Sequence, residues 1–335
     1  MRTVGLPVSV SGGGAEMSVL GFGCAALLGR ASRKESLTAL GTAFDQGITF
    51  YDTARSYGYG GSEGLLGEFF AGRREKVVIC TKFGILPASA GGWRQKIKPL
   101  ARAVVKAIPA LRRAAQAQAA TQFVGGQFDL ATLKASFETS LRELRTDYVD
   151  MLILHAAPES VLAQADLLEA MGRLVESGKV RMAGISAELP VISRYFKERP
   201  KPLTTAQFEL NLPLMDFVEE TRKNADLLLV ANHPYGGPGG DAAARIDSLR
   251  RSTSLPKTLR EKLVLNDPQV LPEVVLNCIL DGTGVTAAIP AMIQPQHIAS
   301  NIAAIEHCRF TSEELALMRR SVTIHIPQAP NTSSQ

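Results

Sequence analysis

Three polar residues of different chemistry each follow a short apolar segment of the chain. Asp52 follows Ile-Thr-Phe-Tyr, Lys82 follows Val-Val-Ile-Cys-Thr, and His155 follows Met-Leu-Ile-Leu. Apolar runs of this kind are typical of strands buried in a parallel sheet, and the active sites of barrel enzymes lie where such strands end. One charged residue at such a position is ordinary for a loop. A carboxylate, an amine and an imidazole at successive strand ends indicate a shared site.

Tyr57 lies five residues after Asp52, on the loop expected to follow the same strand. A phenol has an ordinary pKa of about 10, so it is a weak acid at neutral pH. A neighbouring Lys82 ammonium is expected to lower that pKa, and Asp52 would keep Lys82 charged and in place. His155 could donate a hydrogen bond to an oxygen that gains negative charge. This group suits a carbonyl that receives hydride or an alcohol that loses it, and hydride must come from a cofactor.

The elements that must position these residues alternate between strand-like and helix-like patterns. The apolar runs are Val19–Gly23, Ile48–Tyr51, Val77–Thr81, Met151–Leu154, Met182–Ile185, Thr205–Phe208, Leu227–Ala231 and Val285–Ile289. Helical patterns lie between them, one of which begins with the capping-box sequence Ser32-Arg33-Lys34-Glu35. Eight strands that alternate with helices predict an α/β fold, a (β/α)8 TIM barrel formed as one domain by residues 1–335. The first run could instead form half of an N-terminal β-hairpin, with VGLPVSV as its partner.

A basic insertion at residues 85–128 interrupts the pattern after the third strand. Between Gly84 and Asp129 there is no acidic residue, and the cations are Arg94, Lys96, Lys98, Arg102, Lys106, Arg112 and Arg113. The stretch LARAVVKAIPALRRAA has apolar residues at helical spacing and a basic opposite face, and Pro109 is expected to kink it. Because the insertion leaves from the expected catalytic end, it is a candidate lid, with Trp93 as a candidate pocket residue. The alternative is a solvated amphipathic helix on the barrel rim.

Composition restricts the class of protein. Of the 335 residues, 45% are hydrophobic and 21% are charged, as in a soluble globular protein. The chain has no apolar run of roughly 18 residues and no signal-peptide pattern, so we expect a cytoplasmic protein without a membrane partner. The net charge of +5 is concentrated in the insertion, which does not favour a nucleic-acid partner. The four cysteines lack metal-ligand spacing, so we expect reduced thiols and no metal.

Four sequence stretches, in this order, carry a family resemblance: YDTARSYGYGGSEGLLG, VVICTKFG, DYVDMLILH and GKVRMAGIS. From about Leu20 to Arg320 the chain resembles the aldo-keto reductase family. The resemblance implies a barrel that binds a nicotinamide cofactor without a Rossmann domain. It also implies an NAD(P)-dependent oxidoreductase that acts on a small carbonyl or alcohol (an aldehyde, ketone or sugar), with Tyr57 as general acid/base. The implied supporting residues are Asp52, Lys82 and His155.

The same resemblance implies a set of cofactor contacts: Gly23, Cys24, Asp52, Ser186, Gln207, His233 and Asn301. Ser186 and Gln207 match residues that bind the nicotinamide carboxamide, but the Asn that usually follows the Ser is Ala187 here. The sequence Asn232-His233-Pro234 replaces the aromatic residue that stacks on the nicotinamide. Tyr235 is a candidate to take over that contact.

The last strand departs from the pattern of NADP-preferring members. Ala291, Met292 and His297 stand where those members have Lys, Ser and Arg. Of the residues in that pattern, only Asn301 is present in this chain. A 2′-phosphate requires charge-assisted donors. We therefore expect either NAD or NADP to serve, with NAD favoured. The alternative is another cation with the same role: Arg245, Arg250 or Arg251.

Two other functional classes remain open from the residues. The chain could be a nucleotide-binding regulatory subunit that has the barrel fold but little turnover. The replaced cofactor-contact residues are consistent with this alternative. A basic, helix-mediated interaction protein is supported only by the insertion. The sequence leaves the substrate, the direction of reaction and the oligomeric state undetermined.

Overall fold

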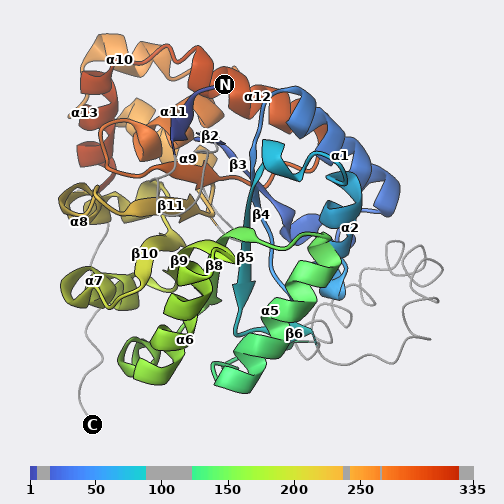
Figure 1. The fold of residues 1–335 in the computed structure, drawn as a ribbon. Coiled ribbons are helices and arrows are strands. Elements are labelled where there is room, and N and C mark those ends of the chain that lie inside the picture. The colour runs from blue at the N-terminus through green and yellow to red at the C-terminus, as the bar shows by residue number, and fades with distance from the viewer. Residues whose placement is uncertain (6–15, 88–122, 237–241, 265, 324–335) are drawn as a thin grey trace, which may run out of the picture.

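The computed structural model describes residues 1–5, 16–87, 123–236, 242–264 and 266–323. At its centre is a parallel sheet with the strand order β12-β11-β10-β9-β8-β5-β4-β3. A bridge between Leu20 and Ala288 joins the two ends of this order, so the sheet closes into a barrel surrounded by helices (Figure 1). The eight barrel strands are β3 (Gly21–Gly23), β4 (Phe50–Asp52), β5 (Val78–Phe83), β8 (Val149–His155), β9 (Val180–Ser186), β10 (Leu203–Glu209), β11 (Leu228–Asn232) and β12 (Ala287–Ile289). The predicted (β/α)8 barrel is confirmed.

Helices connect and cover these strands. The described α-helices are α1 (Arg33–Asp45), α2 (Ser62–Phe69), α5 (Leu130–Leu144), α6 (Ala165–Glu176), α7 (Leu189–Glu198), α8 (Val218–Lys223), α9 (Ala242–Arg251), α10 (Lys257–Lys262), α11 (Val270–Leu280), α12 (Pro295–Glu306) and α13 (Ser312–Thr323). Short 3₁₀ turns are η1 (Cys24–Ala26), η2 (Tyr57–Gly60), η3 (Arg74–Lys76), η4 (Glu159–Ala163) and η5 (Leu212–Phe217).

Local sequence signals explain where several helices begin. Ser32 accepts a hydrogen bond from the backbone of Glu35, and the Glu35 side chain accepts one from the backbone of Ser32, so α1 has the predicted capping box. The same reciprocal bonds join Thr311 and Glu314 at the start of α13. These pairs satisfy amide groups that have no partner within the helix.

The first apolar run supplies barrel strand β3, so the alternative that made this run half of the N-terminal β-hairpin is wrong, although a hairpin does lie before it. β1 (Thr3–Gly5) pairs antiparallel with β2 (Glu16–Ser18), and the chain then enters β3. Ser18 exchanges hydrogen bonds with Thr49, which precedes β4. The hairpin therefore covers the amino ends of the strands. In Figure 1 the N-terminus lies at the top, whereas the arrowhead of β5 points to the bottom.

The insertion begins and ends on a short antiparallel ribbon made of β6 (Leu86–Pro87) and β7 (Phe123–Val124). The predicted basic helix, its Pro109 kink and the candidate lid residue Trp93 lie outside the described residues.

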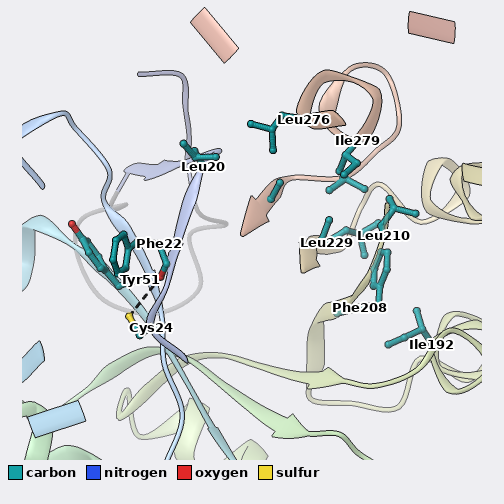
Figure 2. Packing of buried hydrophobic residues seen from close by; sticks show 14 of the residues in the cluster. Leu20, Phe22, Cys24, Tyr51, Ile192, Phe208, Leu210, Leu229, Leu276 and Ile279 are labelled. Carbon is teal, nitrogen blue, oxygen red and sulfur yellow. Dashed lines mark hydrogen bonds between the residues drawn. The ribbon is translucent and has the colours of Figure 1, made fainter. Parts of the chain in front are cut away.

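Apolar side chains fill two layers on either side of the barrel wall. The inner layer includes Phe50, Cys80, Ile153 and Val230. The outer layer lies between the strands and the helices. Figure 2 shows part of it, with Leu276 and Ile279 from α11 and Leu229 from β11, and with the rings of Phe22 and Tyr51 beside one another.

Strand alternation fixes which polar residues face the barrel axis. Side chains two residues apart lie on the same face of a strand. Asp52 therefore shares the inner face with Phe50, Lys82 with Cys80, His155 with Ile153, and Asn232 with Val230.

Candidate active site

Asp52 and Lys82 form a buried ion pair at the carboxyl ends of two neighbouring strands. Lys82 Nζ donates to Asp52 Oδ1 over 2.7 Å and to the carbonyl oxygen of Thr53 over 2.8 Å. The Lys82 side chain is only 1% exposed. A buried ammonium with two short acceptors is fixed in position and charge.

Tyr57 and His155 lie beside this pair. Lys82 Nζ is 4.9 Å from the centre of the Tyr57 ring, and the rings of Tyr57 and His155 are 5.7 Å apart at an angle of 83°. The structure thus brings together the four residues that the sequence predicted to converge. Their chemical roles are taken up in the proposal below.

The turn that carries Tyr57 depends on glycine. Gly58 has a φ of 60°, and a Cβ atom at this position would lie 2.6 Å from the carbonyl oxygen of Leu27. A side chain at residue 58 would therefore collide with the backbone of the neighbouring turn. The close approach of these two turns sets the position of Tyr57.

A buried polar network anchors the same turn to β5, and the sequence analysis did not identify it. Arg55 forms an ion pair with Glu63, and the hydroxyl of Thr81 donates to Glu63 Oε1 over 2.6 Å. Glu63 is 1% exposed. All three residues fall within the first two of the four stretches that carry the family resemblance, and this was the available signal.

The electrostatics of Tyr57 and Lys82 combine burial with mutual charge. Burial lowers the pKa of Lys82, but the carboxylate of Asp52 and the phenol of Tyr57 act in the opposite direction, and the pKa is raised above its ordinary value. Burial raises the pKa of Tyr57, and the Lys82 charge offsets this only in part. The prediction that the Tyr57 pKa is lowered is therefore wrong, because burial raises this pKa by more than the Lys82 charge lowers it. Tyr57 holds its proton at neutral pH.

His155 is a neutral imidazole in this site. Burial, aided by the Lys82 charge, lowers its pKa to about 3. Its Nδ1 atom is buried and has no hydrogen-bond partner. A neutral ring can donate one hydrogen bond and accept one, so His155 is able to bind a further polar group.

Two of the predicted carboxamide ligands lie at the same mouth. Gln207 and Ser186 are opposite each other on β10 and β9, and Ser186 is also opposite His155. However, Gln207 Nε2 donates to Asp52 Oδ1 over 2.9 Å. Gln207 therefore supports the ion pair, and its Oε1 atom can still accept a hydrogen bond from a ligand.

Gly23 and Cys24 end the first barrel strand. A Cβ atom at Gly23 would lie 3.0 Å from Cγ2 of Ile289, so the strand ends approach closely there. Cys24 is fully buried, with its thiol directed at the carbonyl oxygen of Phe22 (Figure 2). Its own carbonyl oxygen accepts a hydrogen bond from Ser62. Burial raises the pKa of the Cys24 thiol, which stays protonated.

A cleft of about 610 Å³ lies beyond the ends of β11 and β12. Its described lining is Tyr235, Pro268, Gln269, Leu271, Pro272, Ala291, Gln296, His297, Ser300 and Asn301. The Tyr235 hydroxyl donates to Asn301 Oδ1 over 2.5 Å, which joins the turn after β11 to helix α12. This size and mixed lining suit one end of a cofactor. The Tyr235–Asn301 bond was not foreseen from the sequence.

The last residue of β11 and the residue that follows it occupy different environments. Asn232 points inward, and its Oδ1 atom is buried without a partner. His233, which was predicted to contact the cofactor, is exposed and has a φ of 48°. It begins a turn in which its carbonyl oxygen accepts from Gly236.

The positions that the sequence predicted to discriminate between the cofactors do not all face the cleft. Ala291 and His297 line it, but Met292 is 2% exposed and its sulfur accepts from Asn301 Nδ2. The described part of the lining contains no Lys or Arg. Two of the alternative cations, Arg250 and Arg251, pair with Asp247 of their own helix α9.

Among the described residues there is neither a metal-binding cluster nor a helix that could span a membrane. They contain no cluster of His, Cys, Asp and Glu side chains that could hold a metal ion. None of their helices is long and apolar enough to cross a membrane.

The fold and the mouth define a (β/α)8 barrel protein whose site pairs a tyrosine with a fixed ammonium, a combination suited to moving protons. The chain belongs to the aldo/keto reductase family, whose model matches residues 19–237. Probable aldo-keto reductase 1 of Glycine max is 32% identical over 219 residues, which cover 64% of this chain and 54% of that protein. Methylglyoxal reductase YeaE of Escherichia coli is 32% identical over 154 residues, 46% of this chain and 39% of that protein. The chain thus spans about half the length, or less, of these curated relatives.

Solved structures of the family share the fold over nearly the whole chain. The holo form of an aldo-keto reductase from Bacillus halodurans has a TM-score of 0.67 and 22% identity, with 96% of each chain covered. An aldo-keto reductase from Klebsiella pneumoniae in complex with NADPH has a TM-score of 0.63 and 23% identity, with 94% of each chain covered.

Proposed function

We propose that this protein is an NAD(P)-dependent oxidoreductase that interconverts a small carbonyl compound and its alcohol, with Tyr57 as the general acid/base. One observation carries the proposal: the Lys82 ammonium is held by Asp52 and lies 4.9 Å from the centre of the Tyr57 ring. A phenol next to a fixed positive charge can release a proton and take it back.

The residues at the mouth fit a nicotinamide cofactor. Asn232 Oδ1 is a buried acceptor without a partner at the end of β11. Ser186 ends β9, two strands away, and is paired in register with Gln207 of the strand between them. These groups would hold a carboxamide. The cleft lined by Tyr235 and Asn301 would hold the adenosine end. The cofactor, when bound, supplies or accepts the hydride.

Proton transfer follows from the states of the side chains. When a carbonyl carbon gains a hydride, the electron pair of its π bond moves to the oxygen, and Tyr57 gives that oxygen its proton. Lys82 stabilises the phenolate that remains, and Asp52 keeps Lys82 in place. His155 is neutral and can donate a hydrogen bond to the same oxygen. Oxidation of an alcohol reverses each transfer.

The lining of the cleft supports a preference for NAD over NADP. Ala291 and His297 stand in the cleft, and no Lys or Arg is present in its described lining. A phosphate bound without a cation loses charge-assisted hydrogen bonds, whereas NAD needs none there. Each such bond contributes about 1.5–3 kcal/mol.

The test is consumption of NADH and of NADPH by the purified protein with a panel of aldehydes, ketones and sugars, together with cofactor binding by fluorescence. Turnover that requires Tyr57 supports the proposal. Tight cofactor binding without turnover of any carbonyl contradicts it and supports the alternative, a nucleotide-binding regulatory subunit.

A further inference from the structure

Two aromatic rings are stacked beside the turn that carries Tyr57. The rings of Tyr59 and Phe123 have centroids 6.2 Å apart and planes inclined by only 10°. Tyr59 lies two residues after Tyr57 on η2, and Phe123 lies on β7, at the far end of the insertion. Phe123 is 36% exposed, so part of its ring surface is accessible.

The ribbon that carries Phe123 is attached directly to the catalytic end of the barrel. Phe123 pairs with Pro87 on β6, and β6 begins four residues after Lys82. Pro87 also lies against the Tyr57 turn, since a Cβ atom at Gly60 would be 3.3 Å from its Cγ atom. Tyr59, Phe123 and Pro87 therefore form one apolar surface, named here the aromatic wall.

The backbone of Tyr59 supports a specific role for its ring. Tyr59 has a φ of 58°, in the left-handed region that a bulky residue rarely adopts, between Gly58 and Gly60. Such a conformation costs about 1–3 kcal/mol and persists only where surrounding structure holds it. Here it directs the ring to the ribbon.

The turn that carries Tyr59 contributes no unpaired charge to the described part of the wall. Arg55 is the only charged residue between residues 55 and 61, and it is paired with the buried Glu63. A polar or hydrated substrate group placed here would lose water without gaining an ionic partner, whereas a flat apolar group would bury area on both sides.

On the basis of the proposed oxidoreductase function, we propose that the aromatic wall selects carbonyl substrates that carry a planar aromatic ring over small hydrated carbonyls. The carbonyl would reach Tyr57 while the ring of the substrate contacts Phe123 and Tyr59. Each aromatic contact of this type changes specificity by about two- to tenfold.

The experiment compares 4-nitrobenzaldehyde with methylglyoxal as substrates of the full chain at saturating cofactor. The wild type is expected to have the higher kcat/KM for the aromatic aldehyde. Phe123→Ala and Tyr59→Ala should each lower that value about two- to tenfold, mainly through KM, with little change for methylglyoxal. Phe123→Tyr retains the ring and should retain the preference.

Val124→Ala is the matched control. Val124 is the neighbour of Phe123 on β7, is also exposed, and points to the opposite face of the strand. It should leave both substrates unaffected. Melting temperatures of all variants separate loss of the wall from loss of folding.

Equilibrium binding of 4-nitrobenzaldehyde, measured by calorimetry with the oxidised cofactor NAD⁺ present, gives a readout that does not require turnover. Binding that weakens in Phe123→Ala but not in Val124→Ala supports the wall even if the aldehyde is not reduced, and that result contradicts only the proposed function. Turnover with the same ratio of the two aldehydes in every variant overturns the wall and leaves the function standing. Neither binding nor turnover by the wild type contradicts both.

Discussion

Gln207 donates a hydrogen bond to Asp52 across the mouth of the barrel, from Nε2 to Oδ1 over 2.9 Å. The two residues are 155 positions apart in the chain, and the same carboxylate oxygen accepts from Lys82. Gln207 thus acts on the ion pair as well as facing the proposed cofactor site.

Replacement of Gln207 tests this role. Gln207→Leu removes one donor to a buried carboxylate and should lower the free energy of unfolding by about 1–3 kcal/mol. Gln207→Glu has nearly the same size but places a second carboxylate beside Asp52, so it should be less stable still. Urea unfolding of the three proteins measures both differences. A leucine variant as stable as the wild type would show that the bond contributes nothing.

Tyr57→Phe tests the proton donor. The variant keeps the ring beside Lys82 and His155 but has no hydroxyl. Cofactor affinity should stay nearly constant, and turnover should fall by roughly 10²–10⁴-fold. Fluorescence titration with NADH and steady-state kinetics check the two parts separately. Wild-type turnover in this variant rules out Tyr57 as the acid/base.

Lys82→Met tests the ammonium. Asp52 becomes a buried carboxylate without its cation, so stability should fall by about 3–5 kcal/mol, and the double variant Asp52→Asn/Lys82→Met should recover part of this loss. Because the Lys82 charge opposes the rise of the Tyr57 pKa, its removal raises that pKa further. In the folded variant, the alkaline loss of reductase activity should therefore move to higher pH, while the rate at neutral pH decreases. An unchanged pH profile would mean that Lys82 has only a structural role.

Acid should destabilise the protein through His155. Its pKa is lowered by burial from 6.5 to about 3 in the folded state. Below pH 6.5 the unfolded chain binds a proton that the folded protein excludes, so stability is complete above that pH and is lost as the pH falls toward 3. The loss is at most about 1.4 kcal/mol for each pH unit in this window. His155→Gln, which is neutral at every pH, should lose less stability than the wild type between pH 7 and pH 4. Parallel curves for the two proteins would contradict the assignment.

Cofactor choice is tested by restoring two cations in the cleft. Ala291→Lys together with His297→Arg should improve use of NADP, with about 1.5–3 kcal/mol at best from each contact, and should leave NAD use nearly unchanged. The measurement is kcat/KM for both cofactors in the wild type and in the double variant. A wild type that already prefers NADP strongly at pH 8 would contradict the proposed NAD preference.

Features that depend on a few neighbouring residues were predictable from the sequence. The reciprocal capping of Ser32 and Glu35 requires only a four-residue pattern, and it is present in the structure. The barrel followed from apolar runs that alternate with helical periods. The convergence of Asp52, Lys82 and His155 followed from one rule, because parallel strands present their carboxyl ends at the same side of a sheet.

Features that depend on burial or on distant contacts were decided by the tertiary structure. The pKa of Tyr57 depends mainly on how completely the fold removes water from its side chain. This effect raises the pKa by more than the Lys82 ammonium, which the sequence predicted, lowers it. The partner of Gln207 lies on a strand far away in the chain, and Met292 turns into the core although its neighbour Ala291 faces the cleft. The stacking of Tyr59 on Phe123 joins the turn after β4 to the far end of the insertion. Local patterns encode the period and the ends of elements, but closure of the barrel determines which side chains meet and how much solvent they lose.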